Sequence, residues 1–335
     1  MTSAVVSVLM SVYNSSRFVR AVIESILGQT FRDFEFIIID DCSTDNSVEI
    51  VRSYNDPRIR LIPLPENRGL SAALNYGIEQ ARGEYIARAD YDDVPEVARL
   101  ERQLGFLREH PDIVLLGTWN MVIDAEGRLR GRTEYPVSHE EIVEQLAKKN
   151  CFCHSSVIVR TDVVRERRGY RGFRISQDYD LWTRVAERYR VANLPEYLIR
   201  YRVLQRSLSR GANLKRQALE SAMVGYLYVE RRAGRSDPLD NIPFSEQATW
   251  IEQHAHLVRK QAKDKYRDGL ALLMHYGLGE RGTRRALAFC LRGIWNFPRE
   301  RLFWQFLYYH GTSRAIQRLV HVVRNIFRVL YGDHG

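Results

Sequence analysis

The first half of the chain alternates short apolar runs with segments whose apolar residues recur at helical spacing. Strands are predicted at residues 5–10, 34–40, 59–64 and 84–89, and helices at 18–27, 43–54 and 69–83. Ser43 is the expected N-cap of the second helix, and Gly83 is the expected stop of the third. This alternation predicts a largely parallel sheet with helices on its faces.

The pattern becomes mixed after residue 96 and helical after Gly211. The further predictions are a helix at 97–110, strand–turn–strand at 112–127, strands at 155–160 and 197–203, and a helix at 177–188. The sequence at 234–243, GRSDPLDNIP, is the clearest break among the later helices. We therefore expect an α/β domain over residues 1–210 and a helical, basic region over residues 211–335.

A polar cluster follows each of the first four predicted strands. These clusters read SVYN, DDCSTD, ENRG and DYDD, and in a parallel sheet they meet at one edge, where ligands bind. The last cluster puts Asp90, Asp92 and Asp93 into four positions directly after an apolar strand. Clustered carboxylates repel one another and resist burial. A divalent cation between them would remove this cost.

The composition is that of an ordinary soluble globular protein, with 335 residues, 45% hydrophobic and 27% charged. The sequence has no run of 18 apolar residues, so no membrane-spanning helix is expected. The N-terminus has the pattern of a strand rather than of a signal peptide. The four cysteines give no disulfide framework, which favours a cytoplasmic location. CFCH, residues 151–154, is better explained by buried thiols than by a metal site, because no second ligand pair accompanies it.

The net charge of +9 is confined to the C-terminal part of the chain. Residues 281–330 hold ten arginines and one acid, Glu300, whereas residues 1–210 are balanced. A nucleic-acid binder would spread its basic patch over the folded domain, so no nucleic-acid partner is expected. Residues 312–331 form an amphipathic helix pattern with an arginine-rich face. This pattern predicts binding to an anionic membrane surface; the alternatives are packing on its own domain or in a homodimer.

The ordered motifs VSVLMSVYN, DDCSTDNS, ENRGLSAALNYGIEQARGEYIARADYDD, HSSVIVR and QDYDLW resemble those of the family 2 glycosyltransferases. The resemblance covers about residues 4–210. It implies a GT-A fold, which is a Rossmann-like, mixed but mostly parallel sheet with helices on both faces, here followed by a C-terminal helical extension. It also implies a metal-dependent, inverting enzyme of class EC 2.4.

The implied reaction moves a sugar from a UDP- or dTDP-sugar to a hydroxyl of a glycan or lipid-linked glycan acceptor. The cofactor would be Mn²⁺ or Mg²⁺, and the pathway would be polysaccharide or glycolipid synthesis. The enzyme would be cytoplasmic, and peripheral on the inner face of the cell membrane if the basic helix binds lipid.

The resemblance assigns roles to individual residues. Asp92 is the expected metal ligand, and Asp90 is expected to bind the metal's shell or the donor ribose. Asp178 is the expected base, with Asp180 as its rival; Gln177 replaces an acid, which should hold the pKa of Asp178 lower than in a paired site. The nucleotide-sugar-binding candidates are Ser11, Tyr13 (stacking on the base), Asp41 or Asp40 (accepting its ring N–H), Asn67, Arg68 and Asn75.

The sequence departs from the family pattern at a few positions. Cys42 stands where glycine is usual, and Leu204 stands where a histidine approaches the metal or diphosphate. Arg202, Arg206 or Ser207 would then cover the phosphate. Gln177 and Leu204 favour the alternative of a non-catalytic GT-A module that binds a nucleotide or glycan. A nucleotidyltransferase is disfavoured, because SVYNSSRF is not the glycine-rich, basic loop that such enzymes carry after the first strand.

Overall fold

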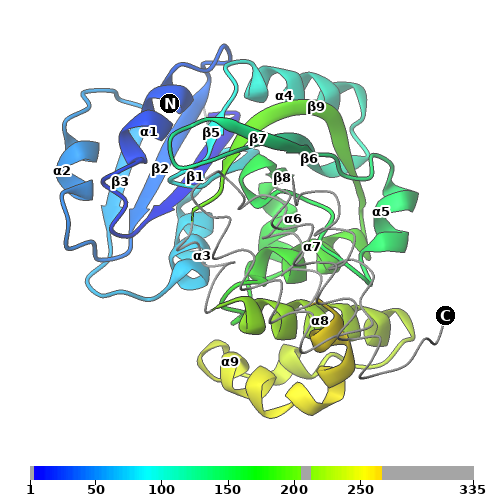
Figure 1. The fold of residues 1–335 in the computed structure, drawn as a ribbon. Helices are drawn as coiled ribbons and strands as arrows, with labels where there is room; N and C mark the ends of the chain where they lie inside the picture. The colour runs from blue at the N-terminus through cyan, green and yellow to red at the C-terminus, as the bar shows by residue number, and fades with distance from the viewer. Residues whose placement is uncertain (1–3, 205–212, 266–335) are drawn as a thin grey trace, which may run out of the picture. The chain divides into compact units, whose positions relative to one another are not determined.

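A computed structural model describes residues 4–204 and 213–265, which belong to one compact unit within Met1–Lys265. The predicted amphipathic helix at 312–331, Arg206 and Ser207 lie outside the described residues. The unit is built on a nine-stranded sheet with the order β3-β2-β1-β4-β8-β6-β9-β5, and β7 pairs with β6 (Figure 1).

The first half of the sheet is parallel, as the sequence predicted. Its elements are β1 (Val6–Val12), α1 (Val19–Leu27), β2 (Phe34–Asp40), α2 (Ser47–Arg52), β3 (Ile59–Pro63), α3 (Leu70–Gln80) and β4 (Tyr85–Ala89). The predicted N-cap was wrong: α2 begins at Ser47, and the amide of Ser43 instead donates to Asp40. The predicted stop at Gly83 was also wrong, since α3 ends at Gln80. Gly83 lies so close to β1 that an added Cβ would be 2.4 Å from the amide nitrogen of Ser7.

The second half of the sheet is mixed. Its elements are β5 (Val94–Pro95), α4 (Arg99–Glu109), β6 (Ile113–Ile123), β7 (Leu129–Thr133), α5 (His139–Gln145), η1 (His154–Ser156), β8 (Ile158–Arg160), α6 (Thr161–Glu166), α7 (Gln177–Ala186) and β9 (Arg190–Arg202). Strand β8 runs antiparallel to β4 and β6, whereas β6 and β9 are parallel. The strand–turn–strand predicted at 112–127 was wrong, because β6 runs unbroken to Ile123. The turn comes later, where the Asp124 carboxylate binds Arg128 and Arg130.

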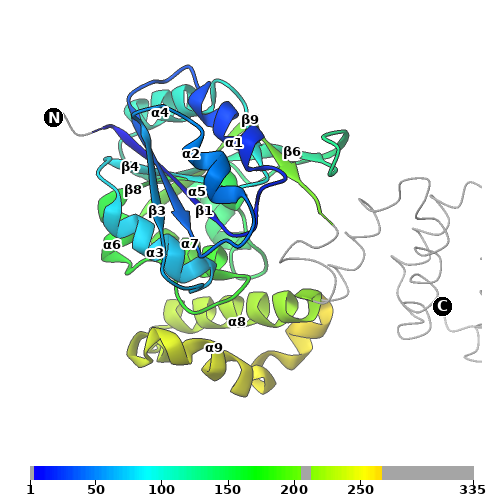
Figure 2. The same cartoon turned by 90° about the vertical axis from the view of Figure 1, so that its left-hand side faces the viewer.

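The helices that follow are α8 (Leu214–Arg232), η3 (Pro238–Asn241), α9 (Phe244–Gln253) and η4 (Ala255–Val258). They form a layer below α7 in the rotated view (Figure 2). Helix α8 lies beyond the boundary predicted at residue 210, yet it contributes Met223, Leu227 and Tyr228 to the same core as Trp182 of α7. The described part of the helical region therefore shares a core with the sheet.

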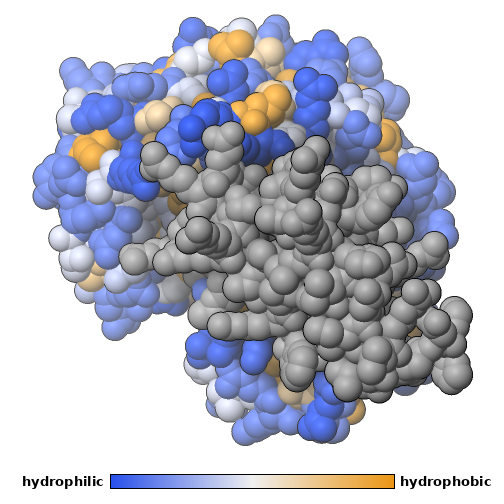
Figure 3. Space-filling model, viewed as in Figure 1, coloured by the Kyte–Doolittle hydropathy of each residue, from blue (hydrophilic) through white to orange (hydrophobic). Residues whose placement is uncertain are grey.

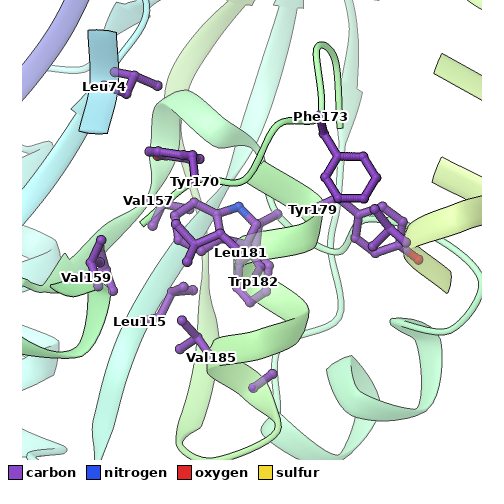
Figure 4. Packing of buried hydrophobic residues seen from close by; sticks show 14 of the residues in the cluster. Leu74, Leu115, Val157, Val159, Tyr170, Phe173, Tyr179, Leu181, Trp182 and Val185 are labelled. Atoms are coloured by element: carbon purple, nitrogen blue, oxygen red, sulfur yellow. The ribbon is translucent and has the colours of Figure 1, made fainter. Parts of the chain in front are cut away.

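Alternating residues of the central strands fill an apolar core on each face of the sheet. Val8 and Met10 of β1 face the helices α1 and α4, whereas Leu9 faces α3 and the α7–α8 side. On the second side, Trp182 packs among Tyr170, Leu181 and Val157 (Figure 4). Helices thus cover both faces, which confirms the predicted architecture.

The surface carries few large apolar side chains. The described residues on the face shown in Figure 3 are mostly hydrophilic, with scattered hydrophobic ones. The exposed large apolar or aromatic side chains of the described residues are Tyr13, Val97, Leu129, Val229, Phe244 and Leu257. Within the described ranges, no helix has the length and apolar character needed to cross a bilayer.

Candidate active site

The carboxyl ends of three neighbouring strands bring the predicted residues to one edge of the sheet. Strand β1 lies between β2 and β4, with Val12 opposite Asp40 and Met10 opposite Ala89. The segments that follow these strands carry Tyr13, Asp41 and Asp90. The amide of Asp41 donates to the carbonyl of Val12 at 2.9 Å, which fixes the end of β2 against that of β1.

The loops after β1 and β2 bind each other through side chains. The amide oxygen of Asn14 accepts hydrogen bonds from the backbone of Thr44 at 2.8 Å and of Asp45 at 3.3 Å. Asn14 and Cys42 have positive φ angles of 49° and 64°. The side chain of Tyr13 beside them is 48% exposed, so one face of its ring is available for stacking. Ser11, at the end of β1, is buried.

Replacing Cys42 by glycine should stabilise the protein. A non-glycine residue in the left-handed region costs about 1–2 kcal/mol, and the greater freedom of glycine in the unfolded chain offsets roughly 0.5–1 kcal/mol of the gain. We therefore expect Cys42→Gly to raise the free energy of unfolding by up to about 1 kcal/mol in urea titrations. Cys42→Ala is the matched control, because it keeps the Cβ atom. A glycine variant less stable than the alanine variant would contradict this explanation.

Asp41 organises the loop that leads into α3. Its carboxylate accepts hydrogen bonds from the amides of Arg68 at 2.7 Å and Gly69 at 2.9 Å, and the side chain of Asn67 donates to its carbonyl at 3.0 Å. Asp40 is equally buried, and its carboxylate is 3.3 Å from the amide of Ser43. The side chain of Arg68 on this loop is 46% exposed, and its Nε lies 3.4 Å from the carboxylate of Glu66. The loop therefore carries an exposed arginine whose ion pair is at the surface.

Asn75 is engaged within the protein. Its amide group pairs with both the N–H and the C=O of Tyr170, at 2.8 Å each. Arg202 is similarly engaged: its guanidinium donates to the carbonyls of Asp92, Asp124 and Ala125. Both side chains hold neighbouring segments at the edge of the site.

The three aspartates after β4 have different environments. Asp90 forms an ion pair with buried Arg88 at 2.5 Å. Asp93 is buried and accepts hydrogen bonds from the hydroxyl of Ser155 at 2.5 Å and the amide of Arg202 at 2.7 Å. Burial and the charge of Asp90 raise the pKa of Asp92 to about 7. Burial and the neighbouring carboxylates raise the pKa of Asp93 well above its ordinary value too, but its two hydrogen bonds tie it to the turn. Among the described residues Asp92 forms no ion pair, unlike Asp90.

The turn fits a divalent cation bound together with a ligand. Among residues 4–204 and 213–265, no group of three or more His, Cys, Asp or Glu side chains forms a complete metal site. Mg²⁺ and Mn²⁺, however, keep several waters and bind through one or two carboxylates plus substrate phosphates. Asp92, with its raised pKa, and the oxygen of Asp90 that is not paired with Arg88 are a suitable donor set.

Asp178 lies in the first turn of α7 and is 9% exposed. Its carboxylate accepts a hydrogen bond from the side chain of Asn150 at 2.8 Å. Burial, and to a smaller extent the charge of Asp90, raise the pKa of Asp178 to about 6. Gln177 removes one negative charge, but burial dominates and keeps this pKa above the ordinary value. A carboxyl group with such a pKa can take up a proton near neutral pH.

Asp180 has a separate, structural environment. It is fully buried and binds Arg171 at 2.7 Å and Arg184 at 2.9 Å. Arg171 also binds Asp237 at 2.8 Å, which connects α7 to η3. These guanidinium groups hold the pKa of Asp180 below its ordinary range, even though burial opposes the shift. Asp180 therefore belongs to an ion-pair network.

Sequence reasoning missed Arg88, His154 and Asn150 as contributors to the site. Nε of Arg88 donates to Nε2 of His154 at 3.2 Å, and that nitrogen lies 2.9 Å from the hydroxyl of Tyr170. Burial and the charge of Arg88 lower the pKa of His154 to about 3, so its ring is neutral. An arginine inside a predicted apolar strand, two residues before Asp90, was a usable signal. The sequence around Asn150 contained none.

Comparisons with known sequences show which proteins this chain is similar to. The profile of glycosyl transferase family 2 matches residues 7–168. The putative glycosyltransferase EpsE of Bacillus subtilis is 39% identical over 204 residues, which cover 59% of this chain and 72% of EpsE. The O-antigen biosynthesis glycosyltransferase WbnJ of Escherichia coli is 36% identical over 215 residues, covering 62% of this chain and 83% of WbnJ.

Solved structures give the same result for the fold. TarS 1–349 of S. aureus in complex with UDP-GlcNAc has a TM-score of 0.56 at 17% identity, covering 92% of this chain and 93% of that one. The mannosyltransferase PcManGT of Pyrobaculum calidifontis, in complex with GDP-Man and Mn²⁺, has a TM-score of 0.54 at 18% identity. That match covers 98% of this chain and 88% of PcManGT. At such identities the likeness concerns the fold.

Proposed function

Because this chain belongs to the family 2 glycosyltransferases and has their GT-A fold, we propose that it moves a sugar from a nucleoside diphosphate sugar to an acceptor hydroxyl with inversion. One observation carries the proposal: residues 150–155 bind Asp178 through the side chain of Asn150 at 2.8 Å and the aspartate turn through the hydroxyl of Ser155 at 2.5 Å, which joins the two acidic groups in one site. A proton acceptor and a diphosphate-binding turn in one site are what this reaction requires.

The donor would bind at the ends of β1 and β2. The exposed ring of Tyr13 offers a stacking surface for uracil or thymine, and Asp40 or Asp41 would accept the ring N–H. The exposed guanidinium of Arg68 suits a phosphate. Ser11, Asn67, Asn75 and Asp90 complete the proposed pocket, the two asparagines by holding its loops. A UDP- or dTDP-sugar is the proposed donor, and the complex of TarS with UDP-GlcNAc supports the nucleotide-sugar class.

Asp92 and Asp90 would hold Mn²⁺ or Mg²⁺. The ion would supply positive charge for the diphosphate leaving group. Support comes from the Asp92 carboxylate, which forms no ion pair among the described residues, and from the Mn²⁺ in the complex of PcManGT. Arg88 fixes one oxygen of Asp90, which leaves the other free to face the ligand.

In the proposed transfer, the Asp178 carboxylate accepts the proton of the acceptor hydroxyl. The hydroxyl oxygen then bonds to the anomeric carbon on the face opposite the diphosphate, whose bond to the sugar breaks. One displacement of this kind inverts the anomeric centre. The hydrogen bond from Asn150 fixes the orientation of the carboxylate.

The proposed acceptor is a glycan or lipid-linked glycan in polysaccharide or glycolipid synthesis, in line with the role of WbnJ in O-antigen biosynthesis. An acceptor of this kind is consistent with a cytoplasmic enzyme whose predicted basic helix at 312–331 binds the membrane surface. Residues 312–331 lie outside the described residues, so membrane binding, packing on its own domain and a homodimer contact all stay predictions.

A screen of nucleotide sugars for donor hydrolysis tests the proposal without knowledge of the acceptor. We expect one donor to be cleaved with Mn²⁺ or Mg²⁺, and cleavage to stop when EDTA removes the metal. UDP binding without turnover of any donor would favour the non-catalytic module. Gln177 in place of an acid and Leu204 in place of a histidine are the residues that favour this alternative.

A further inference from the structure

Glu220 lies on α8 but binds the segment that leads into the helix of Asp178. Its carboxylate accepts hydrogen bonds from three consecutive backbone amides, of Arg174 at 3.3 Å, Ile175 at 2.8 Å and Ser176 at 3.1 Å. Glu220 is 2% exposed. Three consecutive backbone N–H groups therefore bind one side chain from a helix more than forty residues later in the chain.

This carboxylate holds the chain where it enters α7. Ser176 is the N-cap residue of α7, but its side chain makes no capping hydrogen bond; its hydroxyl is 3.1 Å from that of Ser221 on α8. Glu220 binds the amide of this residue and those of the two residues before it, so it fixes the entry to the helix. A negative charge close to a helix N-terminus is also favourable, and Glu220 supplies it two residues before Asp178 in the chain.

Helix α8 also holds the segment that carries Asn150, the hydrogen-bond donor to Asp178. The hydroxyl of Tyr228 donates to the carbonyl of Val143 at 3.2 Å. At Gly225 an added Cβ would be 2.5 Å from the carbonyl oxygen of Ala147, so only glycine allows this close approach. Both segments that orient Asp178 are thus fixed on α8.

We propose that Glu220 is a positioning residue for sugar transfer: it fixes residues 174–176 and thereby holds the Asp178 carboxylate at the acceptor hydroxyl. The inference rests on the proposed role of Asp178. It lies beyond the family match, which ends at residue 168. It gives α8, which belongs to the predicted C-terminal region, a role in sugar transfer.

Glu220→Gln tests the proposal with little change in shape. The carboxamide can accept with one oxygen only, and its NH₂ group faces a backbone N–H. We expect kcat to fall at least about tenfold, since small misplacements of a reacting group have large effects. The KM for the donor should stay within about twofold, because the donor side of the site is untouched. Glu220→Ala should lower kcat further.

Hydrogen–deuterium exchange gives a second measurement that needs no substrate. In Glu220→Gln, the amides of residues 174–176 should exchange faster, while those of β1 and β2 stay protected. Glu230→Gln is the matched control on the same helix, because Glu230 binds Arg235 at the surface. It should leave both kinetics and exchange unchanged. Ser221→Ala is a milder change and should lower kcat by a smaller factor. If Glu220→Gln does not fold, the kcat of Ser221→Ala tests the positioning role instead.

The outcomes separate this inference from the proposed function. If the wild-type protein cleaves or transfers no donor, the proposed function fails. If the wild type is active and a folded Glu220→Gln variant keeps its kcat within about twofold, the positioning role is refuted. Equal losses of kcat and donor affinity, or the same loss in Glu230→Gln, would also overturn it, because they indicate a general weakening of the fold. If Glu220→Gln does not fold, an unchanged kcat in Ser221→Ala would refute the positioning role.

Discussion

Replacing Asp178 by asparagine should lower the rate of sugar transfer by about a thousandfold or more while UDP binding is retained. The carboxamide keeps the size of the side chain and the hydrogen bond from Asn150, but it cannot accept the acceptor proton. Loss of a positioned base costs about 10²–10⁴ in rate. Steady-state kinetics and UDP titration calorimetry of both proteins measure the effect. Transfer at the wild-type rate would refute the role of Asp178.

The same carboxylate predicts the pH dependence of the wild type. Burial raises the pKa of Asp178 to about 6, and only its ionised form can act as a base. The rate should therefore rise with pH below about 6, close to tenfold per unit, and level off above it. A profile that is flat between pH 5 and 7 would contradict the assignment.

Stability distinguishes Asp178 from Asp180. The folded protein binds the Asp178 proton more tightly than the unfolded chain, so stability falls as pH rises from the ordinary value of 3.8 to about 6. Asp178→Asn removes this charge and should be at least as stable as the wild type at pH 8. Asp180→Asn, in contrast, leaves Arg171 and Arg184 short of a buried partner. It should lose about 3–5 kcal/mol of stability, measured by urea unfolding.

Replacing Asp92 by alanine should abolish transfer and also the effect of Mn²⁺ on UDP affinity. Among the described residues its carboxylate forms no ion pair, unlike that of Asp90, and burial together with the charge of Asp90 raises its pKa to about 7. Loss of a group that stabilises developing charge costs about 10²–10³ in rate. UDP calorimetry with and without Mn²⁺ reports on the metal directly, without any need for the sugar.

Asp112→Ala is the matched control, because Asp112 is an exposed aspartate that binds Arg190 at the surface. It should keep both the rate and the effect of Mn²⁺. If Mn²⁺ raises UDP affinity equally in the Asp92→Ala variant and in the wild type, then Asp92 is not a ligand and the metal binds elsewhere.

Local periodicity was sufficient for the parallel half of the fold. Each apolar run in the first 90 residues became a strand, because the two faces of a buried sheet both need apolar side chains. Periodicity failed at β6, because a turn was predicted within residues 112–127 and the strand continues to Ile123. Gly117 makes room for the side chain of Asn193, since an added Cβ would be 2.1 Å from its amide oxygen. A contact across 76 residues leaves no local signal.

The candidate site shows the same limit. The family motifs identified Asp90, Asp92 and Asp178 as candidates, but they could not show which aspartate is occupied by hydrogen bonds within the protein. A turn-orienting role for Asp93 was predicted from the sequence, but its bonds to Ser155 and Arg202 span 62 and 109 residues, so only the folded chain identifies these partners. The partners of Asn75 and Glu220 are likewise distant in sequence.

These bonds of Asp93 bear on which parts of the gene can be expressed separately. A fragment that stops at residue 168, where the family match ends, contains Ser155 but lacks β9 and the amide of Arg202. Its buried Asp93 would miss one of two donors, and β6 would lose the parallel neighbour with which it pairs along most of its length. Such a truncation should yield an insoluble or unfolded product. Truncations for crystallisation or for grafting this module onto another enzyme should end after η4, so that Asp237 and the core residues Ile251 and Val258 are kept.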